Sequence, residues 1–223
     1  MPRTLTADEY LLRVREKVDA LKARNRNPGK FNSQGTHAEI CIYFANRAIQ
    51  IGEGCFRIYD LQVPLLILAR VLCEDLIRLF WASQSTENAA EFEKLSASEM
   101  TRALRANLLS GRARIRHGSS GEDVTKSSLP ELEGLIAKKK TIENMAKESG
   151  LSKLYDVVYR VGSLVAHGNM IGLESEDPNA MPVLAALSAI NGFLGVITMI
   201  LDGPTPKAKA ILDILGIGKI GGS

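Results

Sequence analysis

The sequence predicts an all-α fold, a single bundle of about seven or eight helices over residues 1–215. Apolar residues recur at spacings of three and four in successive segments, which is the period of an amphipathic helix. Three of these segments follow a Ser/Thr-x-x-Glu capping box, a typical helix start, and none reads as a convincing strand. With 45% hydrophobic and 24% charged residues, the composition is typical of a soluble globular chain.

The first two helices are expected over residues 6–25 and 36–51. Each should begin at a threonine whose hydroxyl caps the helix and whose capping box is completed by a glutamate three residues later. A loop that contains proline and glycine should separate them. Because glycine weakens a helix interior, Gly52 and Gly54 are expected to interrupt the second helix.

A third helix is expected over residues 64–84, with Pro64 in its first turn, where a proline is well tolerated. Residues 86–110 should form one or two further helices, because a capping box that begins at Ser96 lies inside this segment. Gly111 should end it.

A polar loop is expected over residues 112–128. Pro130 should then start a charged helix that continues to Gly150 and carries Lys138–Lys140 on a solvated face. A further helix over residues 154–169 should follow directly.

Residues 178–201 carry no charge and are long enough to span a bilayer, but their small and polar members favour a buried core helix in a protein that is not in the membrane. A short helix over residues 206–215 is expected next. The remaining residues, 216–223, contain a G-x-G-x-x-G pattern that no strand precedes, so we interpret them as a flexible glycine-rich tail.

The net charge indicates which partners the protein can bind, and the cysteines indicate its cellular compartment. A net charge of +3 permits contact with nucleic acid without demanding it. The three cysteines are odd in number and form no C-x-x-C pair, so neither a disulfide framework nor a zinc site is indicated. The N-terminus has no apolar signal region. A cytoplasmic protein is therefore expected.

A polar stripe marks residues 154–169 as the candidate site. At about 100° per residue, Asp156, Arg160, Ser163 and His167 share an arc of roughly 60°. The other side chains of this segment are apolar enough to be largely buried, so the stripe should need partners or a ligand. His167 suits proton transfer near neutral pH and Arg160 suits a phosphate. The competing interpretation is an ion pair between Asp156 and Arg160, with His167 satisfied near the helix end.

The run from Arg160 to His167, RVGSLVAH, resembles the Arg-x(4-6)-His motif of HEPN domains, the higher eukaryotes and prokaryotes nucleotide-binding superfamily. Residues 65–81 look like an apolar helix, bearing an arginine and an acidic residue, found in uncharacterised bacterial HEPN-like proteins. The resemblance implies RNA cleavage without metal or cofactor, by attack of the ribose 2′-hydroxyl on the adjacent phosphate. It assigns catalysis to Arg160 and His167, and we expect Ser163, Asp156 and Asn169 to position groups.

The same resemblance implies a toxin or an antiviral effector, with RNA as substrate and a neutralising or regulatory protein as a possible partner. HEPN nucleases place two motifs across a two-fold interface, so a homodimer is expected. Val161 stands where active members commonly carry a polar residue, a role that Ser163 could fill. The alternatives are a noncatalytic HEPN-like module that binds RNA, a nucleotide or a protein, and a membrane-associated protein.

Arg70, Glu74 and Arg78 form a row at four-residue spacing on the third helix. Such rows are usually ion pairs. The functional alternative is that Glu74 braces Arg160 from the neighbouring helix.

Arg112 to His117 also fits Arg-x(4)-His, but this run lies at the start of a Gly/Ser-containing loop and has no apolar helical frame. We interpret it as a solvated basic loop, with contact to an RNA backbone as the alternative.

Overall fold

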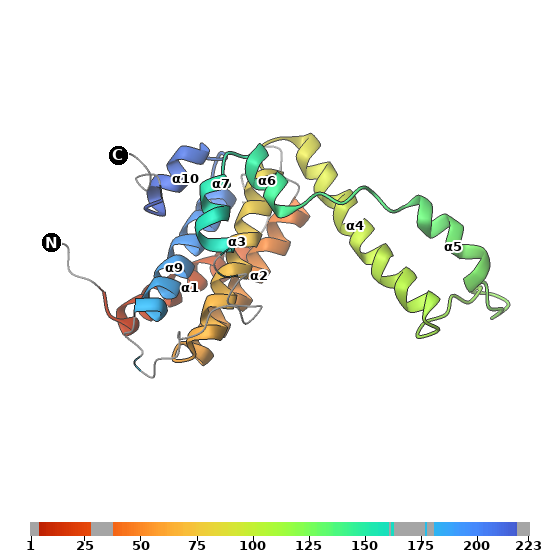
Figure 1. Ribbon diagram of the computed structural model, residues 1–223, viewed down its shortest axis with the longest axis horizontal. Coiled ribbons are helices and arrows are strands. Elements are labelled where there is room, and N and C mark those ends of the chain that lie inside the picture. Colours follow the sequence, from red (N-terminus) through yellow and green to blue (C-terminus); the bar gives the residue numbers. More distant parts are fainter. Residues whose placement is uncertain (1–4, 28–37, 161, 163–176, 178–180, 218–223) are drawn as a thin grey trace. The chain divides into compact units, whose positions relative to one another are not determined.

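The computed structural model describes residues 5–27, 38–160, 162, 177 and 181–217 (Figure 1). Helices are the only extended regular elements in these ranges, which confirms the all-α class. A single isolated β-bridge, between Arg116 and Asp123, is the one β-type pairing recorded for them.

The chain divides into two compact units. Unit 1 comprises residues 1–89 and 141–223, and unit 2 comprises Ala90–Lys140. The sequence patterns predict one domain for both units and give no signal at either boundary. The first boundary falls inside a helix, and the second follows the last residue of Lys138–Lys140.

The helices of unit 1 are α1 (Ala7–Asn25), α2 (Ala38–Ile58), α3 (Gln62–Ala82), α6 (Ile142–Glu148), α7 (Ser152–Leu154), the π-helix η2 (Tyr155–Tyr159), α9 (Met181–Asp202) and α10 (Ala208–Ile214). Helix α4 (Thr86–Leu109) begins in unit 1 and continues into unit 2, which also contains α5 (Thr125–Gly134).

The uncharged helix α9 lies at the core of unit 1, as predicted. It packs against α1, α2 and α3, and its buried side chains include Ile190, Phe193 and Ile197. Full burial of each such side chain stabilises the fold by about 1.5–3 kcal/mol. By length and composition alone α9 could also cross a bilayer, a test that the core helix of a soluble protein passes equally well.

Helix α1 begins as predicted. The Thr6 hydroxyl accepts a hydrogen bond from the Glu9 backbone N–H at 3.3 Å, and the Glu9 carboxylate accepts one from the Thr6 N–H at 2.8 Å. The start predicted for α2 at Thr36, and nearly all of the loop before it, lie outside the described residues.

The predicted end of α2 is wrong, because the helix continues through Gly52 and Gly54 to Ile58. A Cβ atom at Gly52 would lie 2.3 Å from Cγ2 of Val18 in α1. Glycine at this position therefore allows the backbone of α2 to approach α1 closely, and the packing that results offsets its low helix propensity.

Two further predictions are wrong, the capping box at Ser96 and the single helix from Pro130 to Gly150. Helix α4 is continuous, so Ser96 lies in a helix interior and caps nothing, whereas Gly111, at φ +71°, follows the helix end as expected. The single helix predicted from Pro130 to Gly150 is instead two: α5 begins earlier, at Thr125 within the predicted loop, and ends at Gly134, and α6 begins after Thr141. The Thr141 hydroxyl accepts from the Asn144 N–H, so Lys138–Lys140 precede a capped helix and belong to none.

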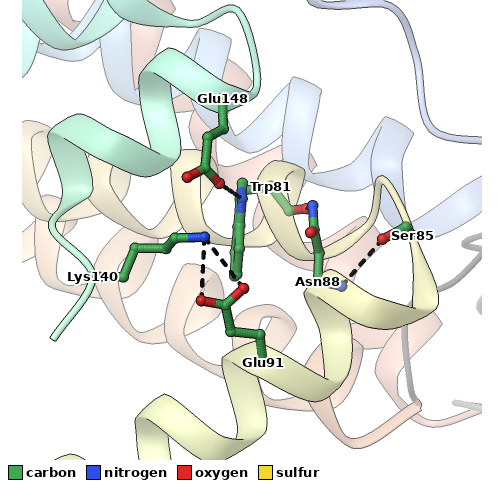
Figure 2. Close-up of polar contacts among 6 residues, drawn as sticks. All are labelled: Trp81, Ser85, Asn88, Glu91, Lys140 and Glu148. Carbon is green, nitrogen blue, oxygen red and sulfur yellow. Dashed lines mark hydrogen bonds and ion pairs between the residues drawn. The ribbon is translucent and has the colours of Figure 1, made fainter. Parts of the chain in front are cut away.

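The tryptophan of α3 is fully buried in unit 1. Its indole Nε1 donates to the Glu148 carboxylate at 2.7 Å, and its carbonyl accepts from the Asn88 side chain at 2.9 Å. Figure 2 shows the Trp81–Glu148 bond and the Ser85 hydroxyl that caps α4 at the Asn88 N–H. It also shows the ion pair of unit 2 between Lys140 and Glu91, at 3.2 Å.

The three cysteines are free and buried, which agrees with the absence of a predicted disulfide framework. Burial raises the pKa of Cys55 to about 12 and raises that of Cys73 further. Neither thiol is therefore a ready nucleophile at neutral pH.

Candidate functional site

The start of the predicted striped segment is helical but not α-helical throughout. After α7, residues Tyr155–Tyr159 form a turn of π-helix, and the N–H of Arg160 donates to the carbonyl of Tyr155, five residues earlier. A π-helix has more residues per turn than an α-helix, so the 100° step does not apply here. Single π-turns are frequent at functional sites.

Asp156 and Arg160 form an ion pair on this turn, with 3.0 Å between Oδ1 and Nε. Both side chains are more than half exposed, at 58% and 57%. Glu143, from α6, approaches the same guanidinium at 3.7 Å. The hydrogen bond and the charge of Lys147, and then the charge of Arg160, lower the pKa of Glu143, so this carboxylate stays ionised. The ion pair is the contact that the competing interpretation predicted for Asp156 and Arg160.

The expectation that the apolar residues of this segment are largely buried holds for Leu154, which is fully buried, but is wrong for the turn that follows it. No residue of Tyr155–Tyr159 is buried, and Val157 is 42% exposed. Among the described elements, the turn packs mainly against α3 and α7. Much of its surface therefore stays open to solvent. The exposed stripe residues therefore need no ligand to satisfy them.

Two tyrosines that the sequence analysis did not single out lie between two arginines. The rings of Tyr155 and Tyr159 stack with centroids 4.9 Å apart and 19° between their planes. The Arg160 guanidinium lies 5.4 Å from the Tyr155 centroid, and that of Arg70 lies 4.7 Å from the Tyr159 centroid. Arg70 also donates from Nη2 to the Tyr159 hydroxyl at 3.0 Å. We call these four residues the Arg-Tyr stack.

The available sequence signal for this stack was a pair of tyrosines at four-residue spacing, with an arginine one residue after the second. The fourth member comes from α3, 89 residues away in sequence from Tyr159. Cation–π contacts of this kind stabilise by about 0.5–1 kcal/mol each at exposed sites. The stack ends in the exposed guanidinium of Arg160, a group that suits a phosphate.

The structure does not bring Glu74 to Arg160. Glu74 pairs instead with Arg78, at 2.6 Å on the same helix, as the usual interpretation of such a row predicts. Within the described ranges, the carboxylates at ion-pair distance from Arg160 are those of Asp156 and Glu143. Any bracing of this arginine by acidic residues of the described ranges therefore comes from η2 and α6.

Ser163, His167 and Asn169, with Val161, lie outside the residues that the structure describes. Their roles stay predictions. Gly162 is described, and it is buried against α3, where an added Cβ would lie 2.7 Å from Cβ of Arg70. Close backbone approach at Gly162 thus joins the end of the described segment to the helix that carries Arg70.

A pocket of about 520 Å³ adjoins the same segment, between α3, η2, α9 and α10. Its lining is mainly apolar and includes Leu66, Val158, Gly162, Phe193 and Ile217. This volume is in the range of small-molecule sites. An apolar lining suits an aromatic or aliphatic group and not a phosphate.

His117, the histidine of the second Arg-x(4)-His match, lies in an exposed turn of unit 2. Its Nδ1 lies 3.1 Å from the Ser119 hydroxyl. The absence of an apolar helical frame, predicted from the sequence, is confirmed.

The fold and this surface together define an all-α protein with an exposed guanidinium and a tyrosine pair on a π-helical turn. The chain belongs to a family of unknown function (DUF5677), whose model matches residues 38–179. The match includes the Arg-Tyr stack and the run from Arg160 to His167. No curated protein and no solved structure matches the chain.

Proposed function

We propose that the chain is a metal-independent ribonuclease of the HEPN type, in which Arg160 stabilises charge on the phosphate and His167 moves a proton. The observation that carries the proposal is the accessibility of Arg160, whose side chain is 57% exposed. An RNA phosphate can reach this guanidinium without any rearrangement of the core.

In the proposed reaction a base removes the proton of the ribose 2′-hydroxyl, whose oxygen attacks the adjacent phosphorus. The bond from phosphorus to the 5′-oxygen breaks, and an acid protonates that oxygen. The products are a 2′,3′-cyclic phosphate and a 5′-hydroxyl. Charge-assisted hydrogen bonds from Arg160 stabilise the negative charge that develops on the phosphate in the transition state.

One motif histidine per chain cannot be acid and base in the same step. We therefore propose a homodimer in which the motifs of two copies face a shared RNA strand. The proposal also includes cytoplasmic action as a toxin or antiviral effector, and control by a neutralising protein. Sedimentation as a monomer at micromolar concentration in the presence of RNA would remove the composite site.

The alternative is a noncatalytic module that binds RNA, a nucleotide or a protein. The contacts of Arg160 favour this noncatalytic module, because the carboxylates of Asp156 and Glu143 already neutralise the positive charge of the guanidinium. A phosphate must displace one of these carboxylates or share the arginine with it.

The test compares wild type with His167→Ala and Arg160→Ala on a labelled mixed-sequence RNA with chelator present. We expect cleavage by wild type and a loss of about 10²–10⁴-fold in His167→Ala, the range for removal of a general acid or base. His117→Ala is the matched control, because this histidine belongs to the exposed turn of unit 2, and it should cleave like wild type. Circular dichroism checks that each variant is folded.

Cleavage by His167→Ala at the wild-type rate would contradict the nuclease. RNA binding without cleavage by any of the four proteins would favour the noncatalytic module.

A further inference from the structure

Unit 2 carries the whole excess positive charge of the chain. Its ten basic and seven acidic residues give it a net charge of +3, whereas unit 1 has 18 residues of each sign. The basic residues are concentrated, since residues 100–121 contain five arginines and no acidic residue. Residues 100–121 should therefore produce a positive electrostatic potential that attracts anions.

Three of these arginines follow α4: Arg112 lies in the bend that ends the helix, and Arg114 and Arg116 lie on the non-helical segment that leads into the bridge with Asp123. Exposure alternates over residues 112–116: Arg112, Arg114 and Arg116 are exposed, and the residues between them, Ala113 and Ile115, are partly buried. Alternate side chains of an extended backbone point to one face, about 6.6 Å apart along the chain. We call these three residues the arginine row.

The backbone of the arginine row is held by hydrogen bonds to the segment that leads into α5. The Ile115 N–H donates to the Thr125 hydroxyl at 2.9 Å, and the Ile115 carbonyl accepts from the Val124 N–H at 2.9 Å. The bridge between Arg116 and Asp123 continues this pairing. These bonds fix the backbone of the row. Binding of a ligand therefore carries little entropic cost for ordering that backbone.

Acidic residues neutralise the arginine row only weakly. Asp123 approaches Arg114 at 3.8 Å, and its carboxylate also accepts from the Thr125 N–H at 3.0 Å. A hydrogen bond from the Thr125 side chain, and next the one from its backbone N–H, are the main causes that lower the pKa of Asp123. Among the described residues, neither Arg112 nor Arg116 has an ion pair.

The other two arginines of the same run serve the fold of unit 2. Arg102 donates to the carbonyl of Ala137, and Arg105 pairs with Glu133 of α5. These contacts tie α4 to the chain around α5. The contrast separates two structural arginines from three whose guanidinium groups face solvent.

We infer that the arginine row binds the phosphodiester backbone of RNA. A guanidinium presents a fork of donors that matches phosphate oxygens, and three at regular spacing fit a ligand that is itself a regular row of phosphates. Such contacts hold a strand without reading its sequence. The choice of RNA as the polyanion rests on the proposed function, to which the row would add affinity for substrate.

The experiment measures binding apart from cleavage. The full chain with His167→Ala is titrated into a fluorescein-labelled mixed-sequence RNA, and anisotropy is followed between about 50 and 200 mM salt. The row variant adds Arg112→Gln, Arg114→Gln and Arg116→Gln. The matched control removes the same charge from exposed positions of unit 1, by Arg13→Gln, Arg57→Gln and Lys209→Gln.

Each lost phosphate contact lowers the slope of log K against log salt by about 0.7 for a single strand, so the row variant should lose about 2 from the slope. We expect its affinity at about 100 mM salt to fall at least tenfold, with the slope of the control unchanged. Each single substitution, verified by circular dichroism, should lower the slope by about a third of that amount.

An unchanged slope in the row variant, an equal loss in the control, or no binding of RNA by the starting protein would each overturn the inference. Binding to phosphatidylserine vesicles that depends on the row, without binding to RNA, would overturn it in favour of a membrane surface. If wild type does not cleave RNA and the slope still depends on the row, the row stands and the nuclease fails. If wild type cleaves RNA but the salt slope does not depend on the row, the nuclease stands and the inference about the row fails.

Discussion

Arg47 of α2 donates from Nε to Oδ2 of Asp75 in α3 at 2.8 Å, which places an ion pair where these two helices pack. Asp75 is only 2% exposed, whereas the Arg47 side chain is 36% exposed. Burial raises the pKa of Asp75 above its ordinary range, and the bond to Arg47 opposes that rise. The carboxylate therefore depends on its partner to remain charged inside the fold.

Arg47→Ala should lower the free energy of unfolding at pH 7 by about 2–3 kcal/mol, since an unpaired buried charge costs about 3–5 kcal/mol and solvent near the exposed arginine offsets part of it. Asp75→Asn should cost less, because no charge stays buried. The measurement is urea unfolding.

The cost of Arg47→Ala should also depend on pH. With its pKa raised, folded Asp75 keeps a proton that the unfolded chain has lost, so stability falls as pH rises from the ordinary pKa of an aspartate through the raised one. Loss of Arg47 raises the pKa further and extends that interval. The destabilisation should therefore be larger at pH 7 than at about pH 4, near the ordinary pKa. An equal cost at both would show that Asp75 is not the group concerned.

Trp81 offers a second test within unit 1, because the chain has one tryptophan and its indole is fully buried. Glu148→Ala removes the acceptor of the indole N–H bond and should cost about 1–3 kcal/mol, the range for loss of a partner from a buried hydrogen bond. Glu148→Gln keeps an acceptor oxygen and should cost less. Tryptophan emission during urea unfolding reports both, and equal losses would show that the hydrogen bond is not the cause.

Local patterns predicted much of the fold. Helices α1, α3, α9 and α10 lie within a few residues of their predicted bounds, because capping, apolar period and absence of charge are properties of the segment itself. The error at the end of α2 originates in a contact between distant residues. Gly52 continues a helix because Val18 of another helix packs against it.

The candidate site was harder to predict, for the same reason. The predicted polar stripe depends on the 100° step of an α-helix, and the π-turn at Tyr155–Tyr159 changes that step. Arg70 reaches Tyr159 from α3, a contact that no local pattern contains. The pairing of Asp156 with Arg160 was predictable, because it needs only four-residue spacing.

Asp156→Asn tests whether Arg160 meets RNA. The ion pair is exposed, so its loss should change stability by less than about 0.5 kcal/mol. With one carboxylate fewer beside it, the guanidinium should bind RNA a few-fold more tightly in the His167→Ala background, as measured by anisotropy. The control is Asp19→Asn, which removes the same charge from an exposed position of α1. Weaker binding of Asp156→Asn would show instead that Asp156 holds Arg160 in its binding position.

The two glycines of α2 should respond to alanine with opposite signs. At Gly52 the new methyl group would lie 2.3 Å from Cγ2 of Val18, and this overpacking should cost about 1–3 kcal/mol. At Gly54 the nearest atom, Cδ1 of Leu68, is at an ordinary 3.5 Å, so Gly54→Ala should stabilise by about 0.5–1 kcal/mol through helix propensity.

A double variant identifies the cause at Gly52. Val18→Ala alone should destabilise, because it removes buried methyl groups, but in the Gly52→Ala chain it also removes the clash. The two changes together should therefore cost less than the sum of their separate costs, by an interaction free energy of about 0.5–3 kcal/mol. Thermal and urea unfolding of the four chains measures this difference. Strictly additive costs would mean that the close approach of α1 to α2 is not what requires glycine at this position.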